Sequence, residues 1–352
     1  MIASLSILLF VGWLSLIPKS LWTWFSKFIL ILFPSVCILL MVYYLMPSYT
    51  PPPIITHAQI PLADQQPNRY LMNTIRLLGG HVQSGTYQPG EHIPITLYWQ
   101  PLKQIETNYS IYVSLLDHSM QSVGQHNSYP AQGLRPTRFW HANEVIADQH
   151  FVQIDGGTTA PMIAKIEVGM YKFENRCGQQ PPILDEFGQK TNGIIGMVKI
   201  IPKAWSDENY IPLHVQFDDN IQLAGFNTDC TVPFTSCQLV LYWQPTGHPT
   251  ENYTVFVQLW HETKQVAGFD RLPLNGNYPT TWWEASETIK DSYTVNFTPH
   301  VGMGVMDESY HLFIGLYRFE TGTRLRIRHA GSATVVDEGI VIIIPRETNS
   351  TP

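Results

Sequence analysis

The sequence contains the same strand-like phrase twice: LYWQP occupies residues 97–101 and again residues 241–245. Each copy is followed by a near-match, TNYSIYVSLL at 107–116 and ENYTVFVQLW at 251–260. A spacing of roughly 145 residues is the length of a domain, whereas solenoid repeats recur every 20–50 residues or so. We therefore expect two homologous domains in tandem.

Three further stretches recur in the same order in both halves. In the longest of them we align the two copies on a shared Tyr-Pro, a Trp, a Glu and an Asp. The order predicts a first domain over residues 66–205 and a second over residues 206–345. The paired stretches are IRLLGG (75–80) with IQLAGF (221–226), the segments 127–154 with 274–297, and KIEVGMYKFE (165–174) with HLFIGLYRFE (311–320).

The residue pattern inside each copy is that of β-strands. In ITLYW (95–99) every second residue is large and apolar, and LVLYW (239–243) repeats the pattern. Such alternation places these side chains on one face of a strand, and we expect that face to be a sandwich interior. We predict an all-β fold with two tandem antiparallel β-sandwich domains. The sequence leaves open whether they are immunoglobulin-like or jelly-roll-like.

Composition and motifs argue against several classes of function. Charged residues make up only 14% of the chain, and the net charge of −7 includes no basic cluster, so we expect no nucleic-acid partner. The sequence has no nucleophile elbow, no H-E-x-x-H motif, no P-loop and no dinucleotide fingerprint. We therefore expect that the protein is not an enzyme.

The first fifty residues are almost uncharged and strongly apolar. Residues 1–17 and 28–46 form two long apolar runs, and the second can cross a hydrocarbon core of about 30 Å as a helix. We predict a membrane anchor over residues 1–46 with one or two transmembrane helices. A cleaved signal peptide is the alternative.

The charges near the anchor predict its orientation. Lys19 and Lys27 both precede the second apolar run, and positively charged loops stay on the cytoplasmic side. Residues 47–352 are then expected on the extracytoplasmic side of the cell membrane. Residues 47–65 are rich in proline and predict a stiff stalk, and residues 346–352 predict a frayed tail.

Two cysteines flank a short turn near the start of the second domain. Cys230 and Cys237 could form a disulfide if the domain is exported, and two free thiols are the alternative. Their spacing has no companion His or Cys pair, so it does not indicate a zinc site.

The order LYWQ, NYTVFVQL, YPTTWW and GLYRFETGTRL resembles the β-rich extracytoplasmic module at the C-terminal end of some bacterial membrane glycosyltransferases. Those enzymes belong to the lipid-linked-sugar mannosyltransferase class. The resemblance covers about residues 221–345 and, less completely, residues 75–175. It implies a β-sandwich module without the many-helix catalytic membrane domain, so no catalytic residue is transferred.

Two pairs of acids recur in both copies: Glu144 with Asp148, and Glu287 with Asp291. Carboxylates at a strand edge could hold Ca²⁺ together with backbone carbonyls. A pair held at a suitable separation could also hydrolyse a glycoside. The structural alternative is that the Glu ends a turn and the Asp lies on the following strand. No cofactor is expected apart from this calcium.

Aromatic residues gather in the Pro-rich loop that precedes each acid pair. Tyr278, Trp282 and Trp283 lie in the second copy, with Phe139 and Trp140 in the first. Two adjacent tryptophans cannot both point inward from a strand. At least one of Trp282 and Trp283 is therefore expected at the surface or at a domain interface. Glycan contact, interface packing and a simple loop plug are the three interpretations; as ligand-binding residues we select Trp282, Trp283, Tyr278 and Trp140.

These observations lead to one main hypothesis and two alternatives. The main hypothesis is a membrane-anchored, non-catalytic binding or scaffolding module at the cell envelope, with glycans or an envelope protein as partner. One alternative is an accessory or detached part of a membrane glycosyltransferase that uses lipid-linked sugars. The other is a structural surface protein.

Overall fold

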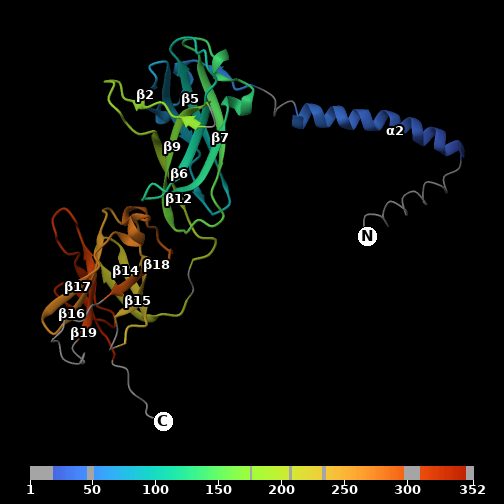
Figure 1. The fold of residues 1–352 in the computed structure, drawn as a ribbon. Helices are drawn as coiled ribbons and strands as arrows, with labels where there is room; N and C mark the ends of the chain where they lie inside the picture. The colour runs from blue at the N-terminus through green and yellow to red at the C-terminus, as the bar shows by residue number, and fades with distance from the viewer. Residues whose placement is uncertain are drawn as a thin grey trace.

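The computed structural model describes residues 19–45, 51–174, 177–205, 208–231, 235–296 and 310–345. Figure 1 shows two β-rich bodies that follow one another along the chain, with helix α2 lying apart from them. The fold is mostly β, and among the described strands only β4 and β12 pair in parallel.

The first β-sandwich is built from two sheets. One sheet has the strand order β1-β8-β5-β3-β2-β11, and the other has the order β4-β12-β9-β6-β7 with β10 added at β9. Its strands are β1 (Ile54–Ile55), β2 (Gln65–Leu71), β3 (Ile75–Val82), β4 (Thr86–Tyr87), β5 (His92–Pro101), β6 (Ser110–Leu116), β7 (Ser122–Ser128), β8 (Val145–Gln153), β9 (Met162–Glu174), β10 (Cys177–Gln179), β11 (Ile183–Leu184) and β12 (Ile194–Ile200).

The second β-sandwich repeats this plan. Its sheets have the orders β18-β15-β14-β13-β20 and β17-β16-β19-β22-β21, so the central strands follow the same order in both sandwiches. Its strands are β13 (Ile211–Phe217), β14 (Ile221–Thr228), β15 (Ser236–Pro245), β16 (Thr254–His261), β17 (Lys264–Gly268), β18 (Ile289–Asn296), β19 (Tyr310–Tyr317), β20 (Ile327–His329), β21 (Thr334–Val336) and β22 (Gly339–Ile343).

Each pair of sheets encloses an apolar core. Ile95, Leu97 and Trp99 of β5 pack against residues of β6, β9 and β12 in the first core. The alternating residues of 239–243 in β15 do the same in the second. The period-two pattern therefore identified the buried faces correctly, and the predicted all-β sandwich architecture is confirmed.

The Pro-rich segment 47–65 differs from the predicted stalk. Strand β1 pairs with β8 at the edge of the first sheet, and Ile60 packs against Tyr98 on the outer face of that sheet. Ile60 is almost completely buried. Burial of a side chain of this size contributes about 2 kcal/mol, which favours packing against the sheet over an extended spacer. From Pro51 onward the described part of this segment belongs to the first sandwich.

The N-terminal part of the described chain is helical. Helix α2 covers Lys19–Leu40 and continues as a π-helical turn over Met41–Leu45. None of the described helices combines the length and the apolar character that crossing a membrane requires. The first predicted apolar run, residues 1–17, and the predicted tail, residues 346–352, lie outside the described residues.

Candidate functional site

One polar loop recurs in both sandwiches, and its second copy lies at the junction between them. In the first sandwich it contains the short 3-10 turns η4 (Pro130–Gly133) and η5 (Thr137–Phe139), and in the second η6 (Pro273–Gly276) and η7 (Thr280–Trp282). The structure aligns the copies on Pro-x-x-Gly-x-x-Pro-Thr, which corrects the alignment on Tyr-Pro. The signal was present in the sequence as an identical spacing of two prolines, a glycine and a threonine.

The first turn of each loop binds the aspartate of the predicted acid pair. The turns η4 and η6 each place two residues in the left-handed region before a glycine, and Ala131 and Leu274 are the first of these. Their backbone N–H groups donate to the buried carboxylates of Asp148, at 2.8 Å, and Asp291, at 3.2 Å. Each aspartate therefore holds a strained turn in place, which any copy of the fold requires.

The second acid of each pair ends the loop. Glu144 accepts a hydrogen bond from the backbone N–H of His141 at 3.2 Å, and Glu287 accepts one from Glu284 at 3.1 Å. Among the described residues, the one group with metal-ligand proximity is Asp229 with two cysteines. The carboxylates of Glu144, Asp148, Glu287 and Asp291 each accept hydrogen bonds from protein donors, which favours a structural role over the calcium interpretation.

The cation that balances each glutamate differs between the copies. Arg135 of the same loop donates to Glu144 at 2.7 Å. Its counterpart in the second copy is Tyr278, whose hydroxyl donates to Glu287 at 2.8 Å. The missing positive charge comes from Lys199 of β12 in the first sandwich, whose Nζ lies 2.8 Å from Glu287. The second loop is therefore completed by a residue of the other domain.

The predicted ligand-binding aromatics take mainly structural positions. Trp140 and Trp283 are fully buried, and their indole N–H groups donate to the carbonyls of Arg135 and Tyr278. Tyr278 is also fully buried, and burial together with Glu287 raises the pKa of its hydroxyl. The ring faces of these three residues are not open to a glycan. This is a correction to the glycan-stacking interpretation for them.

Trp282 fits the domain-interface interpretation. It is partly exposed, and its backbone carbonyl accepts a hydrogen bond from Lys199 at 2.9 Å. Beside it, Asn277 accepts hydrogen bonds from the backbone N–H groups of Ile163 at 2.7 Å and His118 at 2.9 Å. The loop of η6 and η7 therefore forms hydrogen bonds with the first sandwich at the junction.

A cavity of about 770 Å³ lies at this junction, between the first sandwich, the linker and the second sandwich. Its wall combines one indole ring, from Trp205, with hydroxyl, amide and charged groups. Sequence reasoning missed it because its wall comes from three separate segments. The polar and aromatic lining residues are Thr159, Trp205, Glu208, Arg271, Asn275, Asn277, Thr288, Lys290, Asp291 and Ser292.

The charged groups of the junction cavity are held in fixed pairs. Lys290 donates to Glu208 at 2.6 Å, and the hydroxyl of Tyr242 donates to the same carboxylate at 2.7 Å. These hydrogen bonds lower the pKa of Glu208. Burial and the neighbouring carboxylate raise the pKa of Tyr242 to about 12, so it remains a donor at neutral pH. Paired, pre-oriented groups of this kind suit a neutral polar ligand.

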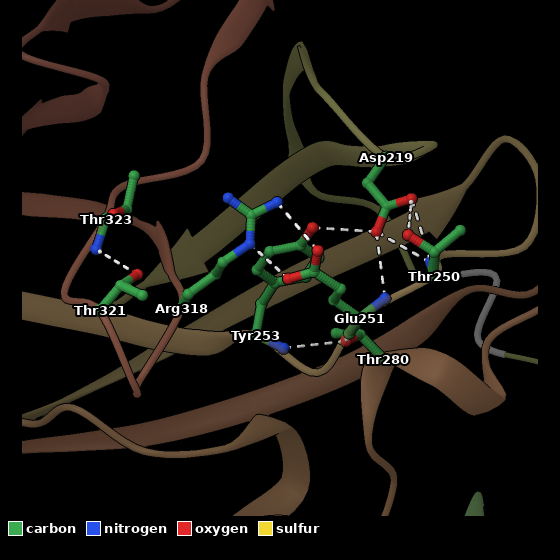
Figure 2. A network of polar contacts seen from close by, with 8 residues as sticks. All are labelled: Asp219, Thr250, Glu251, Tyr253, Thr280, Arg318, Thr321 and Thr323. Atoms are coloured by element: carbon green, nitrogen blue, oxygen red, sulfur yellow. Dashed lines mark hydrogen bonds and ion pairs between the residues drawn. The ribbon is translucent and has the colours of Figure 1, made fainter.

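A second polar network of the second sandwich includes Thr280 of η7 (Figure 2). Asp219 accepts hydrogen bonds from the backbone N–H of Thr250 at 2.8 Å and from the hydroxyl of Tyr253 at 3.0 Å. Thr280 accepts the N–H of Tyr253 at 3.0 Å, and Arg318 pairs with Glu251. This network fastens the turn after β13 to the loop before β16. All of its charges are satisfied internally, and we regard it as structural.

The first sandwich contains a buried chain of titratable groups. His150 lies 2.9 Å from Asp148, and its Nδ1 lies 3.1 Å from Nδ1 of His126. In the second copy Asp291 is instead balanced by the permanent cation Arg271 at 2.8 Å. The buried aspartate of the first sandwich is therefore hydrogen-bonded to an imidazole in place of a permanent cation.

This buried series of titratable groups predicts a pH effect on stability. Burial, and then the neighbouring His150, lower the pKa of His126 below the unfolded value of about 6.5. The unfolded chain then binds more protons, so the free energy of unfolding falls as the pH drops below about 6.5. We expect His126→Asn to weaken this dependence in urea unfolding curves. The exposed His141→Asn is the control, and an equal effect of both variants would contradict the assignment.

The predicted disulfide between Cys230 and Cys237 is present. Cys230 follows β14 and Cys237 belongs to β15, and both pack in the core of the second sandwich. Closing a loop of this length stabilises the folded state by ~2.5 kcal/mol in the chain-entropy model.

The fold and the junction define a tandem β-sandwich protein with a polar cavity between its two sandwiches. No protein-family model and no curated protein matches the chain. Among solved structures it is similar to the native conformation of E. coli alpha-2-macroglobulin, at 10% sequence identity and a TM-score of 0.20. This match covers 78% of the present chain and 15% of the alpha-2-macroglobulin chain.

Proposed function

We propose that the protein is a membrane-attached, extracytoplasmic and non-catalytic binding module whose ligand occupies the junction cavity. The observation that carries the proposal is the cavity itself. At about 770 Å³ it falls within the usual range of small-ligand sites. It also lies between two domains, where such sites often occur.

The lining favours a glycan as ligand. A sugar ring presents hydroxyl groups around its edge and an apolar C–H face. The edge requires many donors and acceptors, which Asn275, Thr288 and Ser292 offer, and the face requires a flat ring such as that of Trp205. The resemblance of residues 221–345 to a module of sugar-transferring enzymes supports the same ligand class.

The attachment and location rest on other features. Apolar side chains of helix α2, among them Leu30, Ile31 and Phe33, are largely exposed. No described part of the protein covers them, so a lipid environment would shield them from water. The Cys230–Cys237 disulfide supports a location outside the cytoplasm, because disulfides persist in oxidising compartments.

A glycan-array screen of the full chain in detergent tests this proposal. We expect reproducible binding that falls at least tenfold in Trp205→Ala, because the flat apolar wall is lost, while its urea unfolding midpoint stays close to that of Trp260→Ala, because both indoles are partly buried. Trp260→Ala, in β16 and outside the cavity lining, is the matched control. A blank array, or equal binding by both variants, would contradict the proposed ligand class or site.

A further inference from the structure

We propose that the loop of η4 and η5 in the first sandwich rests on the same lipid surface that receives helix α2. This inference rests on the membrane attachment proposed above and adds a second contact to it. The protein would then hold its first sandwich against the lipid surface in a fixed orientation.

In the second sandwich, the counterpart of this loop is the loop of η6 and η7, which lies against the first sandwich. This counterpart loop is a contact surface: Asn277 and Trp282 accept hydrogen bonds from the end of the first sandwich. Ile163 of β9 extends across this contact into the core of the second sandwich. The loop is therefore built to meet another surface, and in the second copy that surface is protein.

In the first sandwich the same positions carry exposed apolar residues. Leu134 is the counterpart of Asn277 and is 37% exposed, and Phe139 is the counterpart of Trp282 and is 55% exposed. Tyr129 and Phe151 are also exposed close by. No described part of the chain covers these side chains, although the equivalent loop of the second sandwich is covered.

The path of the chain brings this loop to the helix. Pro51, Pro52 and Pro53 line one groove of about 490 Å³ together with Leu134 and Phe151. The helical segment ends at Leu45, six residues before Pro51. At ~3.5 Å per residue this link spans about 20 Å at most. A surface that takes the helix therefore lies within reach of the loop.

The chemistry of the loop favours lipid over a second copy of the chain. The guanidinium of Arg138 lies 4.8 Å from the ring centre of Phe139. Arginine beside exposed aromatic and leucine side chains is typical of surfaces that sit at the headgroup level, where the cation meets lipid phosphate. The covered loop of the second sandwich instead uses amide and carbonyl groups, which pair with a protein backbone.

Hydrogen–deuterium exchange of the full chain tests the inference. The chain is reconstituted in phosphatidylcholine–phosphatidylglycerol vesicles, and exchange is read over residues 127–141 and, as internal reference, residues 270–284. We expect exchange over 127–141 to be at least threefold slower in the wild type than in the double variant Leu134→Asn/Phe139→Ser. The control variant Phe187→Ser, at an exposed residue outside the loop, should behave like the wild type.

Flotation of the same vesicles separates the two proposals. If the chain does not float with vesicles, the membrane attachment fails and this inference fails with it. If the chain floats but the loop exchanges equally fast in wild type and double variant, this inference alone is overturned. Protection that persists in detergent and grows with protein concentration would assign the loop to a second copy and also overturn it.

Discussion

Replacing Lys199 with methionine is expected to lower the free energy of unfolding by about 3–5 kcal/mol, because it leaves a buried carboxylate without its cation. Lys199 is only 6% exposed, and its Nζ contacts Glu287 at 2.8 Å and the carbonyl of Trp282 at 2.9 Å. Methionine fills a similar volume but offers neither charge nor donor. Urea unfolding followed by circular dichroism measures the loss.

The same variant should uncouple the two sandwiches. Lys199 belongs to the first sandwich and Glu287 to the second, so limited proteolysis should cut the linker around residues 202–208 faster in Lys199→Met. The matched control is Lys290→Met, which removes a half-exposed partner of Glu208 and should cost 1 kcal/mol or so at most. Equal losses in the two variants would show that the interdomain pair has no special role.

The first copy of the loop supplies a rescue for this experiment. There, Arg135 balances Glu144 from within the loop, and Tyr278 occupies the equivalent position in the second copy. Tyr278→Arg in the Lys199→Met background should therefore recover part of the lost stability without restoring the domain contact. Recovery of unfolding free energy with continued linker cleavage would separate the charge balance from the docking.

Features that leave a local signal in the sequence were predicted correctly. The two sandwiches and their buried faces follow from a domain-length repeat and from alternation such as that in residues 95–99, both of which are local signals. The Cys230–Cys237 bond was readable from spacing because both residues flank one short turn.

The site was harder to predict from the sequence because its residues contact partners that are distant along the chain. The role of Asp148 depends on a turn seventeen residues earlier, and the partner of Glu287 lies in the other sandwich. The recurrence of an aspartate in both copies suggested a shared ligand site. In the structure, each aspartate instead binds the same backbone turn of its own sandwich. The prediction that at least one of Trp282 and Trp283 lies at the surface or at a domain interface agrees with the partly exposed Trp282, although the two residues belong to a 3-10 turn and its cap, not to a strand. The junction cavity had no contiguous signal at all.

Replacing Asp291 of β18 with leucine is expected to be as damaging as the loss of Lys199. The carboxylate is completely buried and accepts hydrogen bonds from Arg271 at 2.8 Å, from the hydroxyl of Tyr293 at 2.9 Å and from Leu274 N–H at 3.2 Å. Burial raises the pKa of this carboxyl group, and Arg271 opposes the rise. Leucine leaves a cation and two donors without their acceptor, and we expect a loss of about 3–5 kcal/mol.

A double variant decides whether the loss comes from the charge or from the turn. If the unpaired Arg271 causes it, Asp291→Leu/Arg271→Leu should unfold at a higher urea concentration than Asp291→Leu alone. If the strained turn at Leu274 causes it, the second substitution should bring no recovery. Glu208→Gln, at an exposed carboxylate, is the control and should leave the unfolding midpoint within error. A midpoint for Asp291→Leu equal to that control would show that the buried aspartate does not hold the loop.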